Sequence, residues 1–218
     1  MPPVSDPPPT RLALVRHGQS TWNALGRWQG QADPPLSPLG EEQAVEAAEQ
    51  LQGTGVTGVV TSDLVRARRT GEIVADALGV GPVIVCPELR EYDVGHWSGL
   101  TKPEIEARWP GQQSEWFGGR LPTTPGGEGR AHFDRRVMDA VLRVAAESDP
   151  GSVLVVVTHG GVIRALERAA GASPVPIANL SGRWFEVAAD GDGQEPALRA
   201  GPPLTLVGTD HRTASPSA

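Results

Sequence analysis

The sequence predicts an α/β fold, a three-layer α/β/α sandwich around a mostly parallel central sheet. Short apolar runs rich in valine alternate along the chain with longer segments of helical periodicity, as strands and their crossover helices do. These runs are apolar on both faces, which is typical of strands in a sheet that helices cover on both sides. With 218 residues, 39% of them hydrophobic, the chain has the size of one such domain.

Buried strands are predicted where a β-branched apolar run ends at glycine, proline or a polar residue. In chain order these are residues 12–15, 57–62, 82–86 and 153–157. A last strand over residues 204–208 is expected after a flexible turn that begins beyond Val187.

The clearest helix is predicted from its two ends. Ser37 can be the N-cap, Pro38 takes the first helical position, and Gly53 ends the helix. Further helices are expected over residues 63–78 and about 131–147, and from Gly161 onward.

Residues 110–130 are rich in glycine and proline and predict a long surface loop over the functional site. One domain is expected over residues 11–208, between disordered tails at residues 1–10 and 209–218.

Composition excludes several classes of partner. The net charge of −7 is spread without basic blocks, so no nucleic-acid partner is expected. The longest apolar run, residues 153–157, is far shorter than the ~20 residues of a membrane helix, and the proline-rich start has no signal-peptide core. Cys86 is the only cysteine and forms no internal disulfide. We therefore expect a cytoplasmic protein without a membrane partner, and leave its oligomeric state open, a homodimer included.

Two histidines directly follow predicted strands. Ligands bind outside the carboxyl ends of parallel strands, which is where His17 and His159 fall. Glycines come next, at positions 18, 160 and 161, and allow the backbone to approach a ligand closely. The helix that opens after Gly161 directs free N–H groups toward an anion, so an oxyanion pocket is predicted.

Arginines stand at the same strand ends. Arg16 and Arg66 offer planar donors suited to phosphate or carboxylate. Because no His or Asp cluster of metal-ligand spacing lies nearby, the sequence favours a phosphoryl group held without a metal or other cofactor. Five other cationic or titratable residues are interpreted as structural helix-face residues: Arg68, Arg69, His132, Arg135 and Arg136.

Five segments, in this order, resemble the histidine phosphatase superfamily, the phosphoglycerate-mutase-like proteins. They are "LVRHGQSTWN", "RWQGQADPPLSPLG", "SDLVRARRT", "LREYDVGHWSGLT" and "VVTHGG". The resemblance spans residues 11 to about 170 and implies the phosphoglycerate-mutase-like fold over the predicted domain. It also implies an active-site phosphohistidine, with His17 as the nucleophile.

The residue chemistry agrees with that role. A neutral imidazole can attack phosphorus in line, while Arg16, Arg66 and a protonated His159 offset the charge on the phosphoryl oxygens. An acid is also needed, because an alkoxide leaves poorly near neutral pH. The family pattern implies Glu91 as this general acid and later base, with Asp93 as the fallback.

Further contacts are implied by the resemblance. Positions that match phosphate or substrate contacts of the family are Asn23, Gln29 and Gly30, and Gly160 joins them as a close backbone approach. Lys102, the only lysine, is a candidate contact for a second anionic group of the substrate.

The predicted function is a metal-independent phosphomonoesterase that acts on a small phosphorylated metabolite, whose identity the sequence leaves open. The alternative is a phosphoglycerate mutase with the same phosphohistidine. Lys102 favours it. The short segment between Glu91 and His159, with Arg120 as the single arginine in residues 110–122, disfavours it. A second alternative is a catalytically weak anion-binding or regulatory protein on this scaffold.

Overall fold

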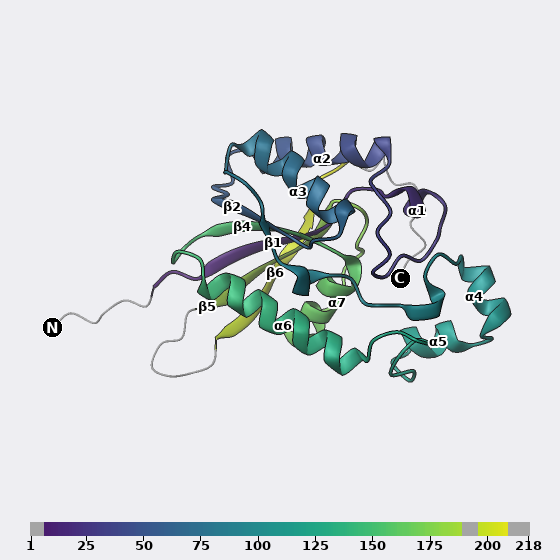
Figure 1. Ribbon diagram of the computed structural model, residues 1–218. Coiled ribbons are helices and arrows are strands. Elements are labelled where there is room, and N and C mark those ends of the chain that lie inside the picture. Colours follow the sequence, from purple (N-terminus) through teal and green to yellow (C-terminus); the bar gives the residue numbers. More distant parts are fainter. Residues whose placement is uncertain (1–6, 189–195, 209–218) are drawn as a thin grey trace.

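The computed structural model describes residues 7–188 and 196–208 and confirms the α/β/α sandwich with its mostly parallel sheet (Figure 1). The six-stranded sheet has the order β3-β2-β4-β1-β5-β6. Its strands are β1 (Thr10–Arg16), β2 (Gly58–Thr61), β3 (Ile84–Val85), β4 (Val153–Thr158), β5 (Ser181–Ala188) and β6 (Ala197–Thr205). The predicted disordered tails lie outside the described residues except for residues 7–10, and β1 already begins at Thr10.

Helices cover both faces of the sheet. In Figure 1, α2 (Pro38–Leu51) and α3 (Val65–Leu78) lie on one face, and α6 (Arg130–Ala146) and α7 (Gly160–Ala169) lie on the other. The side chains of β1 alternate between the two layers, because Leu12 and Leu14 belong to one apolar cluster and Ala13 and Val15 to the other. This alternation confirms that β1 is buried on both faces.

The predicted start of α2 and the predicted end of α3 are confirmed. Ser37 caps α2 by accepting a hydrogen bond from the Gly40 N–H at 3.1 Å, and Pro38 is the first helical residue. α3 ends at Gly79 in the left-handed conformation (φ 66°).

The predicted loop over residues 110–130 is wrong in part. It contains α5 (Gln112–Phe117), and α4 (Lys102–Arg108) precedes it. The capping box in which Thr101 and Glu104 bond each other's backbone N–H starts α4, a local signal that the interpretation overlooked. The remaining short elements are α1 (Thr21–Ala24) and two 3₁₀ turns, Pro87–Leu89 and Gly95–Trp97.

The carboxyl-terminal part also differs from the prediction. β5 was not predicted, and it runs antiparallel to both β1 and β6. β6 begins at Ala197, although the predicted last strand covers only residues 204–208. The segment over residues 197–203, predicted as part of a flexible turn, pairs with β5, since strand pairing outweighs its weak local propensity.

In the described part of the chain, no helix combines the length and the apolar character needed to cross a membrane.

Candidate active site

The sheet brings the two predicted histidines together. Arg16 of β1 pairs with Thr158 of β4 in parallel register, so the next residues, His17 and His159, leave the sheet side by side. The His17 N–H donates to the Thr158 carbonyl oxygen at 3.0 Å, and the imidazole rings lie edge to face with centroids 5.3 Å apart. Both histidines are buried. The carboxyl ends of two neighbouring strands thus form the centre of the site.

His17 is held in the tautomer suited to nucleophilic attack. Its Nδ1 lies 2.6 Å from the Gly18 carbonyl oxygen, which only accepts hydrogen bonds, so Nδ1 holds the proton. Nε2 then has the lone pair, and the Arg66 Nε–H donates to it at 3.2 Å. Burial, followed by the charges of Arg66 and Arg16, holds the pKa of His17 well below its usual 6.5. The imidazole is therefore neutral near neutral pH, with its free nitrogen beside cations.

Arg66 is fixed by backbone carbonyl groups. It lies in the first turn of α3, is 1% exposed, and donates to the carbonyl oxygens of Ala32 (2.7 Å) and Gly30 (2.8 Å). Gly30 has a left-handed backbone (φ 52°), and a Cβ there would lie 2.7 Å from Val94, so this turn requires glycine. Burial, the largest cause, lowers the pKa of Arg66 to about 10, and the guanidinium remains charged near neutral pH.

The loop after α7 supports the first strand end. Asn179 Nδ2 donates to the His17 carbonyl oxygen at 2.8 Å, and Arg16 Nη1 donates to the Ile177 carbonyl oxygen at 3.2 Å. Asn179 is buried, and sequence reasoning missed it because nothing local marks a residue that contacts a strand 162 positions away.

In the free protein, the surroundings of His159 disfavour the protonated imidazole that is expected with a bound phosphoryl group. Its pKa is held well below 6.5 by burial first and then by Arg66, His17 and Arg16. Its Nε2 lies 2.9 Å from the Ser62 hydroxyl, which already accepts the Leu64 N–H and can donate to Nε2. The Nδ1 atom is buried and has no hydrogen-bond partner among the described residues. Because Nε2 can accept from Ser62, Nδ1 is left as a hydrogen-bond donor without a partner in the described part of the chain.

Ser62 is a second residue that sequence reasoning missed. It directly follows β2 at the same sheet edge, and its N–H donates to the Val157 carbonyl oxygen at 3.1 Å. Its position after a strand end is the signal that could have found it.

Glu91 lies in the site and Asp93 does not. The Glu91 carboxylate accepts hydrogen bonds from the N–H groups of Tyr92 (2.8 Å) and Gly161 (3.1 Å). A Cβ on Gly161 would lie 2.2 Å from Glu91 Oε1, so glycine here makes room for the carboxylate. Asp93 instead accepts the Gly95 N–H at 2.9 Å and does not line the cavity. The geometry therefore favours Glu91 over the fallback residue as the acid.

A cavity of about 990 Å³ joins the predicted residues. Its wall contains four of the five predicted catalytic residues, Arg16, His17, Arg66 and Glu91. The fifth, His159, is fully buried beside His17. All five predicted substrate contacts also line the cavity: Asn23, Gln29, Gly30, Gly160 and Lys102.

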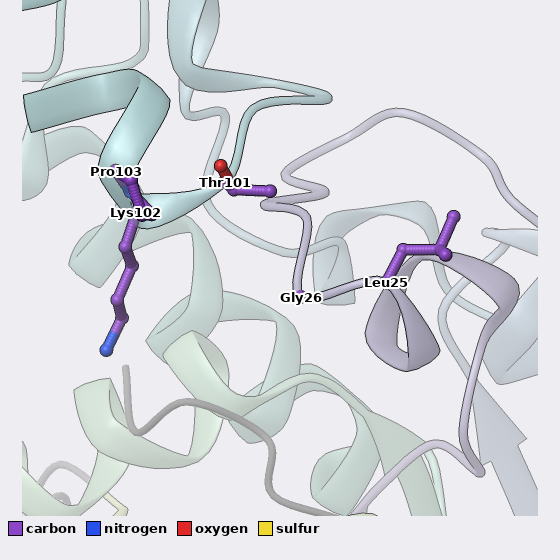
Figure 2. A pocket seen from close by; sticks show the side chains of 5 residues that line it. All are labelled: Leu25, Gly26, Thr101, Lys102 and Pro103. Atoms are coloured by element: carbon purple, nitrogen blue, oxygen red, sulfur yellow. The ribbon is translucent and has the colours of Figure 1, made fainter. Parts of the chain in front are cut away.

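The cavity wall also contains residues beyond the predicted catalytic and substrate-contact positions. They are aromatic or cationic and include Arg27, Trp28, Trp116, Phe117, Arg130, Arg164 and Arg168. Lys102 joins this cavity to a more open pocket of about 430 Å³, in which its side chain extends away from Leu25 and Thr101 (Figure 2). The Lys102 Nζ lies 5.9 Å from the centroid of the Phe117 ring.

The arrangement suits a phosphoryl dianion. Arg16 and Arg66 line the same cavity as His17, the His159 ring lies beside the His17 ring, and the Glu91 carboxylate offers a proton-transfer group in the same wall. Within residues 7–188 and 196–208, no group of three or more His, Cys, Asp or Glu side chains could hold a metal ion.

Comparisons with known proteins agree with this chemistry. The family model described as "Histidine phosphatase superfamily (branch 1)" matches residues 12–184. A glucosyl-3-phosphoglycerate phosphatase of Mycolicibacterium vanbaalenii is 39% identical over 197 residues, which cover 84% of this chain and 87% of that protein. A probable phosphoglycerate mutase of Yersinia enterocolitica is 39% identical over 158 residues, 69% of either chain.

A solved structure is also similar. It is that of a mycobacterial glucosyl-3-phosphoglycerate phosphatase in complex with VO₃, with a TM-score of 0.73 and 33% sequence identity. The match covers 89% of this chain and 99% of that one.

Proposed function

Because the chain belongs to the histidine phosphatase superfamily (branch 1) and is a phosphoric monoester hydrolase, we propose that it dephosphorylates a small metabolite through a phosphohistidine on His17. The observation behind this proposal is the lone pair of His17 Nε2, which lies in the same cavity wall as Arg16, Arg66 and Glu91. A nucleophile, two charge-stabilising cations and an acid–base group are the parts that this reaction needs.

In the first step, His17 Nε2 attacks phosphorus and the bond from phosphorus to the ester oxygen breaks. The Arg66 Nε–H, which donates to Nε2 in the free protein, transfers its hydrogen bond to an equatorial phosphoryl oxygen. Arg16 and the unpartnered Nδ1–H of His159 stabilise the remaining charge. The dianion counteracts the burial and, after it, the arginine charges that lower the pKa of His159.

Protonated Glu91 gives its proton to the departing alkoxide, so that a neutral alcohol leaves. The carboxylate then takes a proton from water, whose oxygen attacks phosphorus and breaks the bond to His17 Nε2. The products are the alcohol and inorganic phosphate, and His17 and Glu91 return to their starting states. The N–H groups of Tyr92 and Gly161 hold the carboxylate through both steps.

Glucosyl-3-phosphoglycerate is our first candidate substrate, since the similar phosphatases described above are named for it. Two properties of the cavity support this choice. Its volume of about 990 Å³ suits a substrate larger than a simple alkyl phosphate, and Trp28 and Trp116 offer flat apolar surfaces for a sugar ring.

The test is a rapid-quench search for an acid-labile, base-stable phosphoenzyme with radiolabelled substrate. Wild-type protein is expected to trap label, whereas His17→Ala is expected to trap none and to lose turnover. The assay is run with and without a chelator, because the mechanism uses no metal. Near-normal turnover by His17→Ala, or loss on chelation that a divalent ion restores, would overturn the proposal.

The mutase is the second candidate, favoured by Lys102 in the cavity wall and by the similar protein from Yersinia enterocolitica. Supplying 3-phosphoglycerate with its bisphosphate primer distinguishes the two functions. We expect inorganic phosphate as the product, and accumulation of isomerised phosphoglycerate would favour the mutase. A weak anion-binding protein would show neither product and no phosphoenzyme.

A further inference from the structure

One face of α7 forms a stripe along the cavity. Gly160, Arg164 and Arg168 are spaced four residues apart, so they share a helix face, and all three line the cavity. The stripe begins beside the catalytic centre, since the neighbouring Gly161 N–H holds Glu91. With a rise of 1.5 Å per residue, the two arginine positions follow at about 6 Å and about 12 Å along the helix axis.

The positive charge of Arg164 is not fully neutralised. Its Nη1 donates to Glu167 Oε2 at 2.7 Å, but Glu167 also accepts the Arg183 Nε–H at 3.0 Å. Glu167 and Arg183 are buried, and Arg183 donates further to the carbonyl oxygens of Ser173 (2.9 Å) and Gly201 (2.6 Å). One carboxylate thus serves two arginines, and the excess charge belongs to Arg164, whose side chain is 31% exposed.

Two further arginines extend this positive region. Arg168 pairs with Asp134 at 2.6 Å in an exposed contact. Arg130, at the start of α6, lies 4.1 Å from the Trp116 ring centroid and donates to the Trp116 carbonyl oxygen. The Nε of Arg130 is buried without a hydrogen-bond partner among the described residues. Burial first, and then Arg168, lowers the pKa of Arg130, so the charges of these two arginines act on each other across α6 and α7.

We propose that Arg164 and Arg168, together with Arg130, bind a second anionic group of the substrate, a carboxylate or a second phosphate. This proposal rests on the proposed function, because the position of the second anion is defined relative to a phosphoryl group that reacts at His17. It assigns the second-anion contact to α6 and α7, whereas the sequence predicted it for Lys102 of α4. The substrate class is therefore a phosphomonoester with a second negative charge, and neutral phosphomonoesters of the same size bind more weakly.

The test centres on two ligands that differ only in the second charge and adds two reference ligands. 3-Phosphoglycerate has a carboxylate where glycerol 3-phosphate has a hydroxymethyl group, and p-nitrophenyl phosphate has neither. The bisphosphate of propanediol replaces the carboxylate by a phosphate and shows which anion is preferred. Values of kcat/KM are measured for each, and dissociation constants are measured by calorimetry on His17→Ala, which does not consume the ligand.

The variants are Arg164→Gln, Arg164→Lys and Arg168→Gln, with Arg135→Gln as the matched control. Arg135 is exposed on α6 and lies outside the cavity. Arg164→Gln leaves Glu167 paired with Arg183, so no buried charge loses its last partner and the fold is expected to persist.

We expect Arg164→Gln and Arg168→Gln to reduce the preference for 3-phosphoglycerate over glycerol 3-phosphate on the order of tenfold to a hundredfold, as loss of a charged hydrogen bond does. Arg164→Lys should restore part of that preference. The arginine variants should reduce p-nitrophenyl phosphate turnover far less than 3-phosphoglycerate turnover, whereas Arg135→Gln should change neither. An unchanged preference, or equal losses on all substrates, overturns the second-anion site. If wild type forms no phosphohistidine, the proposed function fails instead, and the dissociation constants on His17→Ala still decide the second-anion site.

Discussion

At the scale of single residues, the hydrogen bonds of His17 and His159 determine which ring nitrogen of each carries the proton. The Gly18 carbonyl oxygen binds His17 Nδ1, so the lone pair is on Nε2, where it accepts from Arg66 Nε–H. The Ser62 hydroxyl binds His159 Nε2, and His159 Nδ1 has no partner among the described residues. The same imidazole group thus exposes a lone pair at one position and an N–H donor at the other, as the proposed mechanism requires. Backbone and hydroxyl partners, rather than the histidines themselves, assign the two roles.

Glu91→Gln separates proton transfer from phosphate binding at this scale. Glutamine keeps the size of the side chain and can still accept one of the two hydrogen bonds from the N–H groups of Tyr92 and Gly161. It cannot give a proton to the leaving group or take one from water. Turnover of alkyl phosphates should fall by about 10²–10⁴-fold, whereas p-nitrophenyl phosphate, whose leaving group needs no acid, should still phosphorylate His17. Stopped-flow measurement should show a burst of p-nitrophenol. Turnover should then stall at the phosphohistidine, because in the proposed mechanism Glu91 also activates the attacking water. Equal slowing of both esters without a burst would remove Glu91 as the acid and make Asp93→Asn the next test.

At the scale of elements, the segment that contains Glu91 is positioned by a helix on which it does not lie. Arg136 of α6 donates to the carbonyl oxygens of Glu88 (2.6 Å) and Arg90 (3.1 Å) and pairs with Glu128 at 2.7 Å. Glu128 in turn accepts the Asp93 N–H at 2.9 Å. Residues 90–94 form neither helix nor strand, so these hydrogen bonds, rather than pairing in a sheet, satisfy and position their backbone.

Arg136→Gln is expected to loosen that segment. It removes a largely buried ion pair and two bonds to carbonyl groups, so the free energy of unfolding should fall by about 1–3 kcal/mol. Alkyl phosphate turnover should fall more than aryl turnover, because the acid is the displaced group. Arg135→Gln, one residue earlier on the exposed side of α6, is the control for both the denaturation and the kinetic measurements. Unchanged stability, together with equal kinetic effects on the two esters, would contradict this role.

At the scale of the whole molecule, folding buries two imidazoles beside two arginines at one edge of the sheet. Burial is the largest cause that keeps the pKa values of His17 and His159 well below 6.5, and the arginine charges follow. In the unfolded chain both side chains return to their ordinary pKa. Above pH 6.5 both histidines are mostly unprotonated in the folded and the unfolded protein. Below pH 6.5 they bind protons in the unfolded chain before they do so in the folded protein.

The contribution of the two histidines to the free energy of unfolding should therefore be largest above pH 6.5. It should decrease as pH falls from 6.5 toward the pKa values of the folded state. The slope should reach up to about 1.4 kcal/mol per pH unit for each histidine. Urea denaturation across this range measures it, in buffers without phosphate, because a bound anion favours the charged imidazole. His17→Asn removes one of the two titrating groups and should reduce the slope. Equal slopes in the variant and the wild type would show that His17 does not contribute.

Features set by local chemistry could be predicted from the sequence. The apolar runs of β1 and β4, the cap at Ser37 and the glycines after His17 and His159 act within a few residues of themselves. The fold class and the five predicted catalytic positions followed from these features together with the family resemblance. The structure places four of those positions in one cavity wall and His159 directly beside His17.

Tertiary structure alone decided the rest. Asn179 reaches His17 across 162 positions, and β5 exists as a strand because β1 and β6 pair with it on either side. Arg164 has an excess charge only because Glu167 is shared with Arg183 of β5. These properties depend on burial and on partners distant in the chain, and local propensity does not encode which distant groups share a carboxylate or a carbonyl oxygen.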